Sequence, residues 1–432
     1  MATAERALPH VVAWNVTRRC NLACAHCYIA AGSWHAAAEE LDTAAALDVV
    51  DQIVAANPSV LLILSGGEPL VRDDLEAIAE RATAAGATVV VGTNGTGLTD
   101  ERIASLQAAG VKGVAVSIDS LDPVYHDRFR HGAGSLEQTK AAVDRCRAAG
   151  LDVVIQTTVT RGNRAEIGAI AGWAAEKGAV SFNVYFLVRT GRGEGMAALE
   201  PEESDAVLVE LLELEERYRG RMMVRSKCQP QIMRHVHERG GDSPLAAYPT
   251  RCPCGVHYAR ITPDAKVTPC PYSPVVAGDL SESTFGEIWE DSAVFERIRS
   301  GELGGRCGRC EYREVCGGCR ARAYAETGDV MAEDPACDYE PDGTRPVVTP
   351  AAEVPYGAPA EPELAWSTEA ESRMARIPSF VRGVVTARVE AFAAERGYDA
   401  ITPEVLDEVR SALPVDFSKK RPFFLDRKGG SP

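Results

Sequence analysis

Apolar residues in the first half of the chain occur in short unbroken runs, and longer amphipathic stretches separate these runs. The runs are HVVAWNV (10–16), VLLILSGG (60–67), TVVVGTNG (88–95), GVAVSID (113–119), DVVIQTTVT (152–160) and SFNVYFLV (181–188). Runs without polar alternation are typical of parallel strands that are covered on both faces. The stretches between them, such as 42–57 and 136–150, have helical periodicity. The order predicts an α/β fold, a partial (β/α)6 barrel.

The loops that follow these predicted strands are rich in small and polar residues. A loop with Cys20, Cys24 and Cys27 follows the first run, SGGEP (65–69) follows the second, and TNG (93–95) follows the third. Ordinary turn chemistry explains any one of these loops. Functional groups of parallel barrels lie at the C-terminal ends of the strands, so the loops together indicate a site there.

Composition narrows the class of protein. The chain has 432 residues, enough for two or three domains, and a formal net charge of -16. An acidic chain is a poor candidate for binding nucleic acid or an anionic membrane. Residues 1–10 contain no apolar segment of a signal peptide, and no apolar run approaches the ~20 residues of a membrane span. We therefore expect a cytoplasmic protein without nucleic-acid or membrane partners.

The cysteines are numerous and unevenly distributed. Of 13 cysteines, three lie at 20–27, Cys146 stands alone, and nine lie from Cys228 to Cys337. In a cytosolic chain such groups indicate metal binding or catalysis rather than disulfides. Cys146 lies in a helical pattern and is expected to be a buried core residue.

The spacing CxxxCxxC, with Tyr28 after the last cysteine and GGE at 66–68, resembles the radical S-adenosylmethionine (radical SAM) enzymes. The resemblance implies that Cys20, Cys24 and Cys27 hold three irons of a four-iron–four-sulfur cluster. The fourth iron would bind S-adenosylmethionine. The alternative is a zinc site that His26 or a distant residue completes. Otherwise His26 is expected to point away from the cluster.

The same resemblance implies residues that bind S-adenosylmethionine. The candidates are Gly66, Gly67 and Glu68 for the methionine ammonium group, Ser117 and Asp119 for the ribose, Asn94 and Arg130 for the ribose or the carboxylate, and the backbone around Leu187 for the adenine.

The later cysteines are the second candidate for metal binding. On spacing alone, two CxxC pairs indicate zinc. Downstream of a radical SAM core, however, the segment resembles the SPASM extension, which carries auxiliary four-iron–four-sulfur clusters. The implied ligand sets are Cys307, Cys310, Cys316 and Cys337 for one cluster, and Cys252, Cys270 and Cys319 for the other, with Cys254 or Cys228 as its fourth ligand. Thiolate sets serve both metals, so zinc remains the alternative. Ala265 departs from the family pattern, which usually has glycine there.

The composition changes again after Cys337. A Pro- and Ala-rich stretch is followed by a helical pattern that Gly397 ends, and Pro403 begins another. This last pattern resembles the short C-terminal module of the light-independent protochlorophyllide reductase. The expected segments are a radical SAM core (1–220), a SPASM cluster domain (221–341), a linker (342–373), a small helical module (374–415) and a tail (416–432).

Stretches such as 14–28 and 186–193 resemble the haem synthase branch of the radical SAM/SPASM enzymes and its haem d1 relatives. This implies a tetrapyrrole substrate, with oxidative decarboxylation of the propionates of iron-coproporphyrin to vinyl groups. An auxiliary cluster would accept the surplus electron, and a flavodoxin or ferredoxin would be the electron donor. Arg189 and Arg192 are candidates for binding the propionates.

Two other functions stay open. One is a maturase of a ribosomally made peptide. Such enzymes often carry a leader-binding domain before the core, and the roughly ten residues before the first strand are too few for a folded domain. The other is a non-catalytic metal-binding scaffold, against which the intact cysteine and GGE loops argue.

Overall fold

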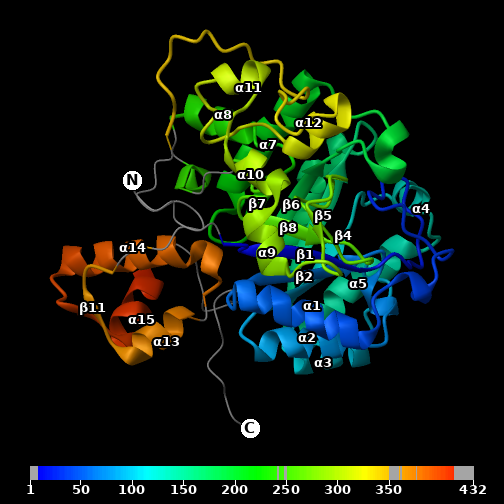
Figure 1. The fold of residues 1–432 in the computed structure, drawn as a ribbon, viewed down its shortest axis with the longest axis horizontal. Helices are drawn as coiled ribbons and strands as arrows, with labels where there is room; N and C mark the ends of the chain where they lie inside the picture. Colours follow the sequence, from blue (N-terminus) through cyan, green and yellow to red (C-terminus); the bar gives the residue numbers. More distant parts are fainter. Residues whose placement is uncertain are drawn as a thin grey trace.

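The computed structural model describes residues 8–240, 243–247, 251–349, 360, 362–375 and 377–412, and one large sheet dominates it (Figure 1). Its strands pair in the order β10-β9-β8-β1-β2-β3-β4-β5-β6-β7. They are β1 Val11–Thr17, β2 Leu61–Gly66, β3 Thr88–Thr93, β4 Gly113–Ser117, β5 Asp152–Val159, β6 Ser181–Phe186, β7 Met223–Lys227, β8 Tyr258–Ile261, β9 Lys266–Thr268 and β10 Gly278–Asp279. From β8 to β7 all neighbours are parallel, and β9 and β10 extend the β8 edge in antiparallel pairs.

All six predicted strands are present as β1 to β6, and the α/β barrel class is confirmed. The sheet is larger than predicted because β7 pairs with β6 and β8 pairs with β1. Both added strands are short and carry polar residues, so their hydrophobic signal is weak. They follow residue 220, so the expected domain boundary there lies within one continuous sheet.

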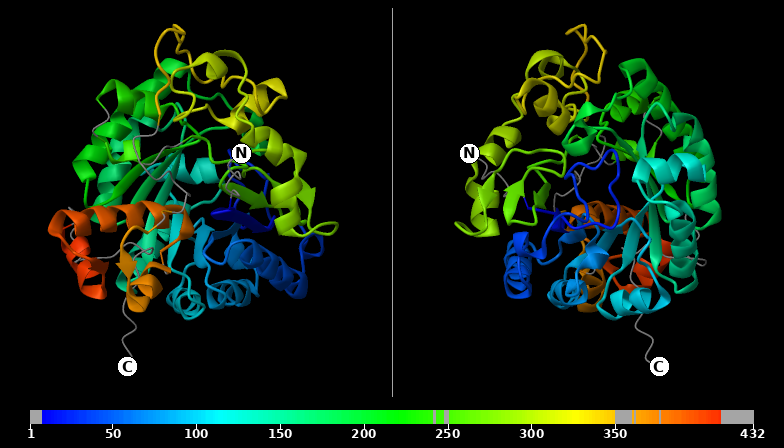
Figure 2. Two further views of the ribbon diagram at one scale, coloured as in Figure 1. Left: turned by 60° about the vertical axis from the view of Figure 1, so that its left-hand side comes forward. Right: turned by 90° about the vertical axis from the view of Figure 1, so that its right-hand side faces the viewer.

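Helices cover the outer face of the barrel sheet (Figure 2). They are α1 Thr43–Ala56, α2 Leu75–Ala84, α3 Asp100–Ala108, α4 Pro123–Arg130, α5 Ser135–Ala148, α6 Ile167–Glu176 and α7 Pro201–Tyr218. A side-chain cap begins α1, because Asp42 accepts a hydrogen bond from the Ala45 amide at 2.9 Å. Alternate strand residues such as Val12 and Trp14 pack outward against these helices. Asn15, the next residue after Trp14, faces the inside of the barrel.

The cysteine-rich region adds short helices around the barrel. They are α8 Ile232–Glu238, α9 Phe285–Asp291, α10 Ala293–Arg299, α11 Gly305–Arg309 and α12 Arg320–Thr327. In Figure 1, α8, α11 and α12 lie together at the top, away from the C-terminal helices at the lower left.

The C-terminal module has its own small core. Its elements are β11 Ala365–Trp366, α13 Thr368–Ala375, α14 Ser379–Arg396, β12 Ala400–Ile401 and α15 Pro403–Ala412. Buried Val389, Ile401 and Val405 form the centre of that core. The module therefore begins earlier than expected, because β11 and most of α13 fall within the span predicted as linker. Residues 350–359 of that span, and the predicted tail 416–432, lie outside the described residues.

Ser379, at the start of α14, connects the module to the barrel. Its hydroxyl lies 2.7 Å from Nδ1 of His10 and accepts a hydrogen bond from Nδ2 of the Asn57 side chain at 3.0 Å. Its own amide donates to the Ser59 carbonyl at 3.2 Å. His10 and Ser59 precede β1 and β2, so the module contacts the N-terminal end of the barrel, opposite the cysteine loop.

Among the helices that the structure describes, none has both the length and the apolar character that a membrane crossing requires.

Candidate active site

The first candidate site is the three-cysteine loop after β1. Cys20 is buried, and Cys24 and Cys27 are half-buried beside it. The Leu22 amide donates to Sγ of Cys20 at 3.4 Å, and the Ala31 amide donates to Sγ of Cys27 at 3.3 Å. Burial raises the pKa of the Cys20 thiol to about 12. Amide donors aimed at sulfur stabilise thiolates, so the loop suits a cluster bound through deprotonated cysteines.

A buried ion pair holds a positive charge next to this loop. Nε and Nη2 of Arg130, at the end of α4, lie 2.7 and 2.6 Å from Oδ2 of Asp119. The Thr158 amide donates to the other oxygen at 2.8 Å. Nη1 of Arg130 lies 3.8 Å from Sγ of Cys24. Two predicted cofactor residues are thus joined to the cluster loop, and their contact with the cofactor stays a prediction.

The ion pair keeps Asp119 ionised. Burial by itself raises the pKa of Asp119, but the Arg130 guanidinium, followed by His26 and His126, outweighs burial and holds this pKa below its ordinary value. The pKa of Arg130 is raised, because Asp119 and Cys24 outweigh its burial. A permanent cation therefore lies beside the predicted cluster ligand Cys24.

Two glycines after β2 allow the GGE loop to lie against the cysteine loop. A Cβ on Gly66, whose φ is +143°, would lie 2.4 Å from the Thr17 carbonyl oxygen. A Cβ on Gly67 would lie 2.2 Å from the Arg19 carbonyl oxygen. Only glycine permits this approach of two backbones. The predicted contact of these glycines with an ammonium group remains untested.

Glu68, the third residue of GGE, is buried and connects β2 to the end of β3. It accepts hydrogen bonds from Thr93 Oγ1 and the Asn94 amide, each at 2.8 Å, and from the Leu70 amide at 3.1 Å. Burial raises the pKa of Glu68 despite these donors. The Asn94 side chain donates to Asn21 of the cysteine loop at 2.8 Å. Glu68 and Asn94 thus join three loops, and their predicted roles toward the cofactor stay open.

The other predicted residues of the core occupy different surroundings. The His26 ring stacks on Phe129 with ring centroids 4.5 Å apart, and burial lowers its pKa to about 4. Ser117 is half-buried at the end of β4, and Leu187 is buried directly after β6. Cys146 is fully buried in the barrel core, as predicted.

The two arginines predicted to bind propionates differ in their contacts. Nε of Arg192 donates to the Cys24 carbonyl at 2.8 Å, and Nη1 donates to the Ala31 carbonyl at 2.7 Å. Arg192 therefore holds the cysteine loop, and its third nitrogen alone is left for a ligand. Arg189 lies at the surface, 3.4 Å from the carboxylate of Glu326. Binding of a propionate by either residue stays a prediction.

Five cysteines gather in a second group. Cys254, Cys270 and Cys319 are buried and pack together with half-buried Cys228 and Cys252. Cys228 directly follows β7 and belongs to this group although it is distant in sequence. Both candidates for the fourth ligand, Cys254 and Cys228, are therefore present, and one thiol exceeds the four that a cubane cluster uses.

The turn between β8 and β9 explains the departure at Ala265. Its φ is +65°, in the left-handed region that glycine usually occupies. Its amide donates to the Thr262 carbonyl at 3.1 Å, and the Thr262 amide donates to the Lys266 carbonyl at 2.8 Å. The turn that a glycine would make is thus retained, at some conformational cost, and it leads β9 toward Cys270.

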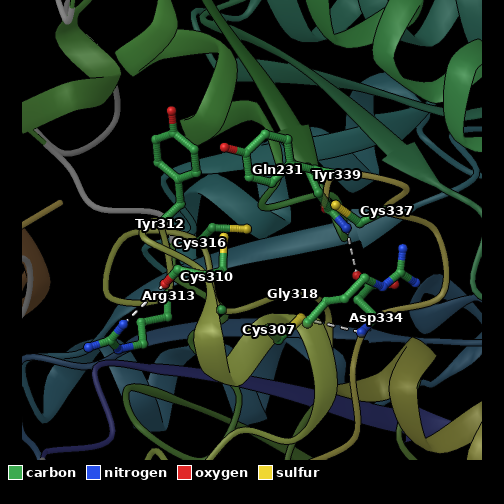
Figure 3. Close-up of a pocket in the computed structure, with 12 residues that line it drawn as sticks. Gln231, Cys307, Cys310, Tyr312, Arg313, Cys316, Gly318, Asp334, Cys337 and Tyr339 are labelled. Atoms are coloured by element: carbon green, nitrogen blue, oxygen red, sulfur yellow. Dashed lines mark hydrogen bonds between the residues drawn. The ribbon is translucent and has the colours of Figure 1, made fainter. Parts of the chain in front are cut away.

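The third group consists of Cys307, Cys310, Cys316 and Cys337, which line a pocket (Figure 3). The Asp334 amide donates to Sγ of Cys307 at 3.4 Å. These cysteines are the predicted set, brought together by α11 and the loops around it.

Buried Asp334 connects the second and third groups. Its carboxylate accepts from the Cys319 amide at 2.6 Å and pairs with Arg322 at 3.1 Å. Nη2 of Arg322 donates to the Cys228 carbonyl at 2.7 Å. Arg322 and Asp334 therefore hold cysteine segments of both groups in place.

All 13 cysteines are free thiols. Within the described part of the chain, no group of three or more His, Cys, Asp or Glu residues is arranged to hold a single metal ion. The amide donors at sulfur and the backbone approach of the glycines nevertheless fit a cluster and an S-adenosylmethionine bound between the two loops.

Sequence reasoning missed a polar wall on the inner face of the barrel. Nε of Arg260, on β8, donates to Asn15 Oδ1 at 2.6 Å, and Nδ2 of the Asn15 side chain donates to the Tyr28 hydroxyl at 2.8 Å. The Tyr28 and Tyr272 rings lie 5.1 Å apart. An arginine between apolar residues in a strand was the available signal, and it was hidden because β8 itself was not predicted.

Comparison with known proteins gives three matched families along the chain. The Radical SAM superfamily matches residues 14–174, the iron-sulfur cluster-binding domain called SPASM matches 252–320, and the Proto-chlorophyllide reductase 57 kD subunit matches 366–410.

Two curated relatives and one solved structure are similar over most of the chain. The AdoMet-dependent heme synthase of Methanosarcina barkeri is 39% identical over 343 residues, which cover 77% of this chain and 97% of that protein. The Pre-heme d1 synthase of Dinoroseobacter shibae is 32% identical, covering 76% of this chain and 85% of that protein. The structure of Streptococcus suis SuiB bound to S-adenosylmethionine has a TM-score of 0.63 at 14% identity, covering 77% of this chain and 78% of that one. It shares the fold.

Proposed function

The chain belongs to the radical SAM superfamily, in the group whose members also carry an iron–sulfur cluster-binding domain and include AdoMet-dependent heme synthase, and from this membership we propose that it acts on a tetrapyrrole. It is a radical SAM enzyme that uses S-adenosylmethionine and four-iron–four-sulfur chemistry. The proposed reaction is the oxidative decarboxylation of propionate side chains of iron-coproporphyrin to vinyl groups. The observation that carries this choice is the 39% identity that extends over 97% of the heme synthase.

The proposed reaction balances for each propionate. One hydrogen atom leaves the carbon β to the carboxylate, carbon dioxide leaves with the breaking carbon–carbon bond, and one electron passes to an acceptor of the iron–sulfur class. When bound, the cluster and S-adenosylmethionine supply the one-electron chemistry that removes the hydrogen atom. An external donor such as a flavodoxin or ferredoxin would reduce the protein.

The residues of the chain position and protect this chemistry. Cys20, Cys24 and Cys27 would hold the cluster, and Arg130 keeps a positive charge 3.8 Å from Sγ of Cys24. The backbones of Gly66 and Gly67 would receive the methionine end of the cofactor. Only glycine at these two positions lets the GGE loop lie against the cysteine loop. Exclusion of water from this loop, in which Cys20 is buried and Cys24 and Cys27 are half-buried, would protect a reactive radical.

The two further cysteine groups would hold auxiliary four-iron–four-sulfur clusters. The proposal implies three clusters, hence about twelve irons per chain after anaerobic reconstitution. Stoichiometric zinc bound by the cysteines from 307 to 337 would contradict it.

The proposed function is tested by a single-turnover assay. The reconstituted, dithionite-reduced protein is incubated with S-adenosylmethionine and iron-coproporphyrin III, and mass spectrometry follows the tetrapyrrole. We expect stepwise loss of carbon dioxide with two hydrogen atoms, and formation of 5′-deoxyadenosine in equal amount. If the protein cleaves S-adenosylmethionine but binds and converts no tetrapyrrole, the peptide-maturase alternative replaces the proposal.

A further inference from the structure

Arg260 is a buried cation of the barrel interior that no carboxylate of the described residues neutralises. Its side chain lies on β8, and the residue is 6% exposed. Its contacts are a 2.6 Å hydrogen bond from Nε to Asn15 and the Tyr28 ring, whose centroid lies 5.8 Å from the guanidinium carbon. Among the described residues, its two terminal nitrogens donate to no acceptor.

Among the described residues, three of the four other buried arginines pair with an aspartate, and the fourth, Arg320, donates to the carbonyls of Val330 and Ala332. Arg130 lies 2.6 Å from Asp119, Arg322 lies 3.1 Å from Asp334, and Arg72 lies 2.7 Å from Asp74. Burial of an unpaired charge is costly, and folded proteins usually compensate it with an opposite charge. Among the described residues, the terminal nitrogens of Arg260 meet neither a carboxylate nor a carbonyl, which indicates that their partner is a ligand.

A second cation without an acidic partner among the described residues lies on β7, at the end of the sheet order. Lys227 ends β7, is half-buried, and pairs in register with Tyr185 of β6. No acid contacts its ammonium group among the residues that the structure describes.

Aromatic residues connect the two cations. The ring of Tyr28 lies beside both Arg260 and Tyr272. Tyr258 and Tyr272 pack in one cluster with Cys228, which directly follows Lys227, and Tyr185 pairs in register with Lys227. The four tyrosines, Tyr28, Tyr185, Tyr258 and Tyr272, therefore connect the surroundings of Arg260 with those of Lys227.

These side chains also lie near two cysteine groups. Tyr28 directly follows Cys27 of the radical SAM loop, and Cys228 of the five-cysteine group directly follows Lys227. Arg260 is close enough to Cys270 of that group to interact electrostatically with it. A ligand held here would lie beside the radical SAM loop on one side and a second cluster site on the other.

We propose that Arg260 and Lys227 bind carboxylate groups of the substrate, and that the four tyrosines hold its flat body between them. This assignment rests on the proposed function, because it takes the ligand to be a tetrapyrrole with several propionates. The two free nitrogens of Arg260 match the two oxygens of one carboxylate. Lys227 binds a second carboxylate as a point charge. The pair thereby determines which propionate faces the radical SAM loop.

The test compares binding of iron-coproporphyrin III with binding of its tetramethyl ester, which keeps the ring and removes the negative charges. Absorbance titrations use the reconstituted wild type, Arg260→Gln, Lys227→Met and Arg260→Lys. Arg81→Gln and Lys177→Met are matched controls on outer helices, where each cation already pairs with an aspartate. Iron content and the Kd for S-adenosylmethionine, measured in each variant, show that the site is intact.

Loss of a charge-assisted hydrogen bond predicts that Arg260→Gln and Lys227→Met each raise the Kd for the acid porphyrin about 10- to 100-fold. Both should bind the ester like the wild type, Arg260→Lys should regain part of the affinity, and the controls should change nothing. The assignment would be overturned if the variants bound the acid and the ester equally weakly, or if they bound the acid as tightly as the wild type. It would also be overturned if the Kd for S-adenosylmethionine rose instead. A wild type that binds neither porphyrin refutes the proposed function and the assignment with it; a wild type that binds the acid while the variants are unchanged refutes the assignment alone.

Discussion

The ion pair between Asp119 and Arg130 should be a main source of rigidity beside the radical SAM loop. Replacement of Asp119 by Asn preserves the shape of the side chain but removes its charge. Asp119 is fully buried and Arg130 is 7% exposed, and the nitrogens lie 2.6 and 2.7 Å from one carboxylate oxygen. In the variant the buried guanidinium would lose its carboxylate partner and keep Sγ of Cys24, 3.8 Å from Nη1, as a neighbour.

The expected magnitude follows from burial. Removal of one partner of a buried ion pair costs about 3–5 kcal/mol, because the other charge stays desolvated. At 1.4 kcal/mol for each factor of ten, local opening of α4 should become roughly 100- to 4,000-fold more frequent. Hydrogen exchange followed by mass spectrometry on the reconstituted protein measures this opening in peptides from β4 and α4.

Asp51→Asn is the matched control. Asp51 pairs with Arg81 at 2.6 and 2.7 Å, distances equal to those of the Asp119 pair although each nitrogen meets a different oxygen, but the two side chains are 45% and 55% exposed. Solvent screens this pair, so exchange in α2 should change less than about fivefold. Similar small effects for both variants would refute the reasoning that burial makes the Asp119 pair strong. A double replacement of Asp119 by Leu and Arg130 by Met should recover much of the protection, though not the charge beside Cys24.

Further predictions concern the cluster ligands, the glycine loop and the C-terminal module. Simultaneous replacement of Cys20, Cys24 and Cys27 by Ala should remove about four irons per chain and abolish cleavage of S-adenosylmethionine, as iron analysis and chromatography of 5′-deoxyadenosine would show; retained cleavage would contradict the ligand assignment. Gly67→Ala should weaken S-adenosylmethionine binding at least ~10-fold in equilibrium dialysis, since a Cβ would lie 2.2 Å from a backbone oxygen and the loops must separate; unchanged affinity would show that the loops yield freely. Burial alone raises the pKa of Glu390, but hydrogen bonds from Trp366 and from the Glu363 and Leu364 amides outweigh burial and lower this pKa. The ionised Glu390 carboxylate therefore stabilises the module above the unfolded pKa, and this stabilisation is lost as the pH falls through the lower folded pKa. Glu390→Gln should therefore speed hydrogen exchange in β11 at neutral pH and make little difference near pH 3; an equal effect at both pH values would exclude the charge as the cause.

The sequence by itself determined the class of fold and the first site. Six apolar runs became β1 to β6, and the loops after them carry the cysteines and the GGE sequence at one end of the barrel. Both features are local: a strand is recognised by its own hydrophobic pattern, and the cluster loop by the spacing of three cysteines. The alternation of buried and exposed positions also placed Cys146 in the core.

The tertiary structure decided which distant residues share a site. Cys228 joins Cys252, Cys254, Cys270 and Cys319 because β7 and β8 continue the barrel sheet at opposite edges, and these strands were too short for their pattern to be recognised. The same closure brings Arg260 to Tyr28 and directs Arg192 to the backbone of the cysteine loop rather than leaving it free. The physical reason is that a strand pattern specifies which face a residue occupies, whereas the partners it meets there depend on which strands the sheet places side by side.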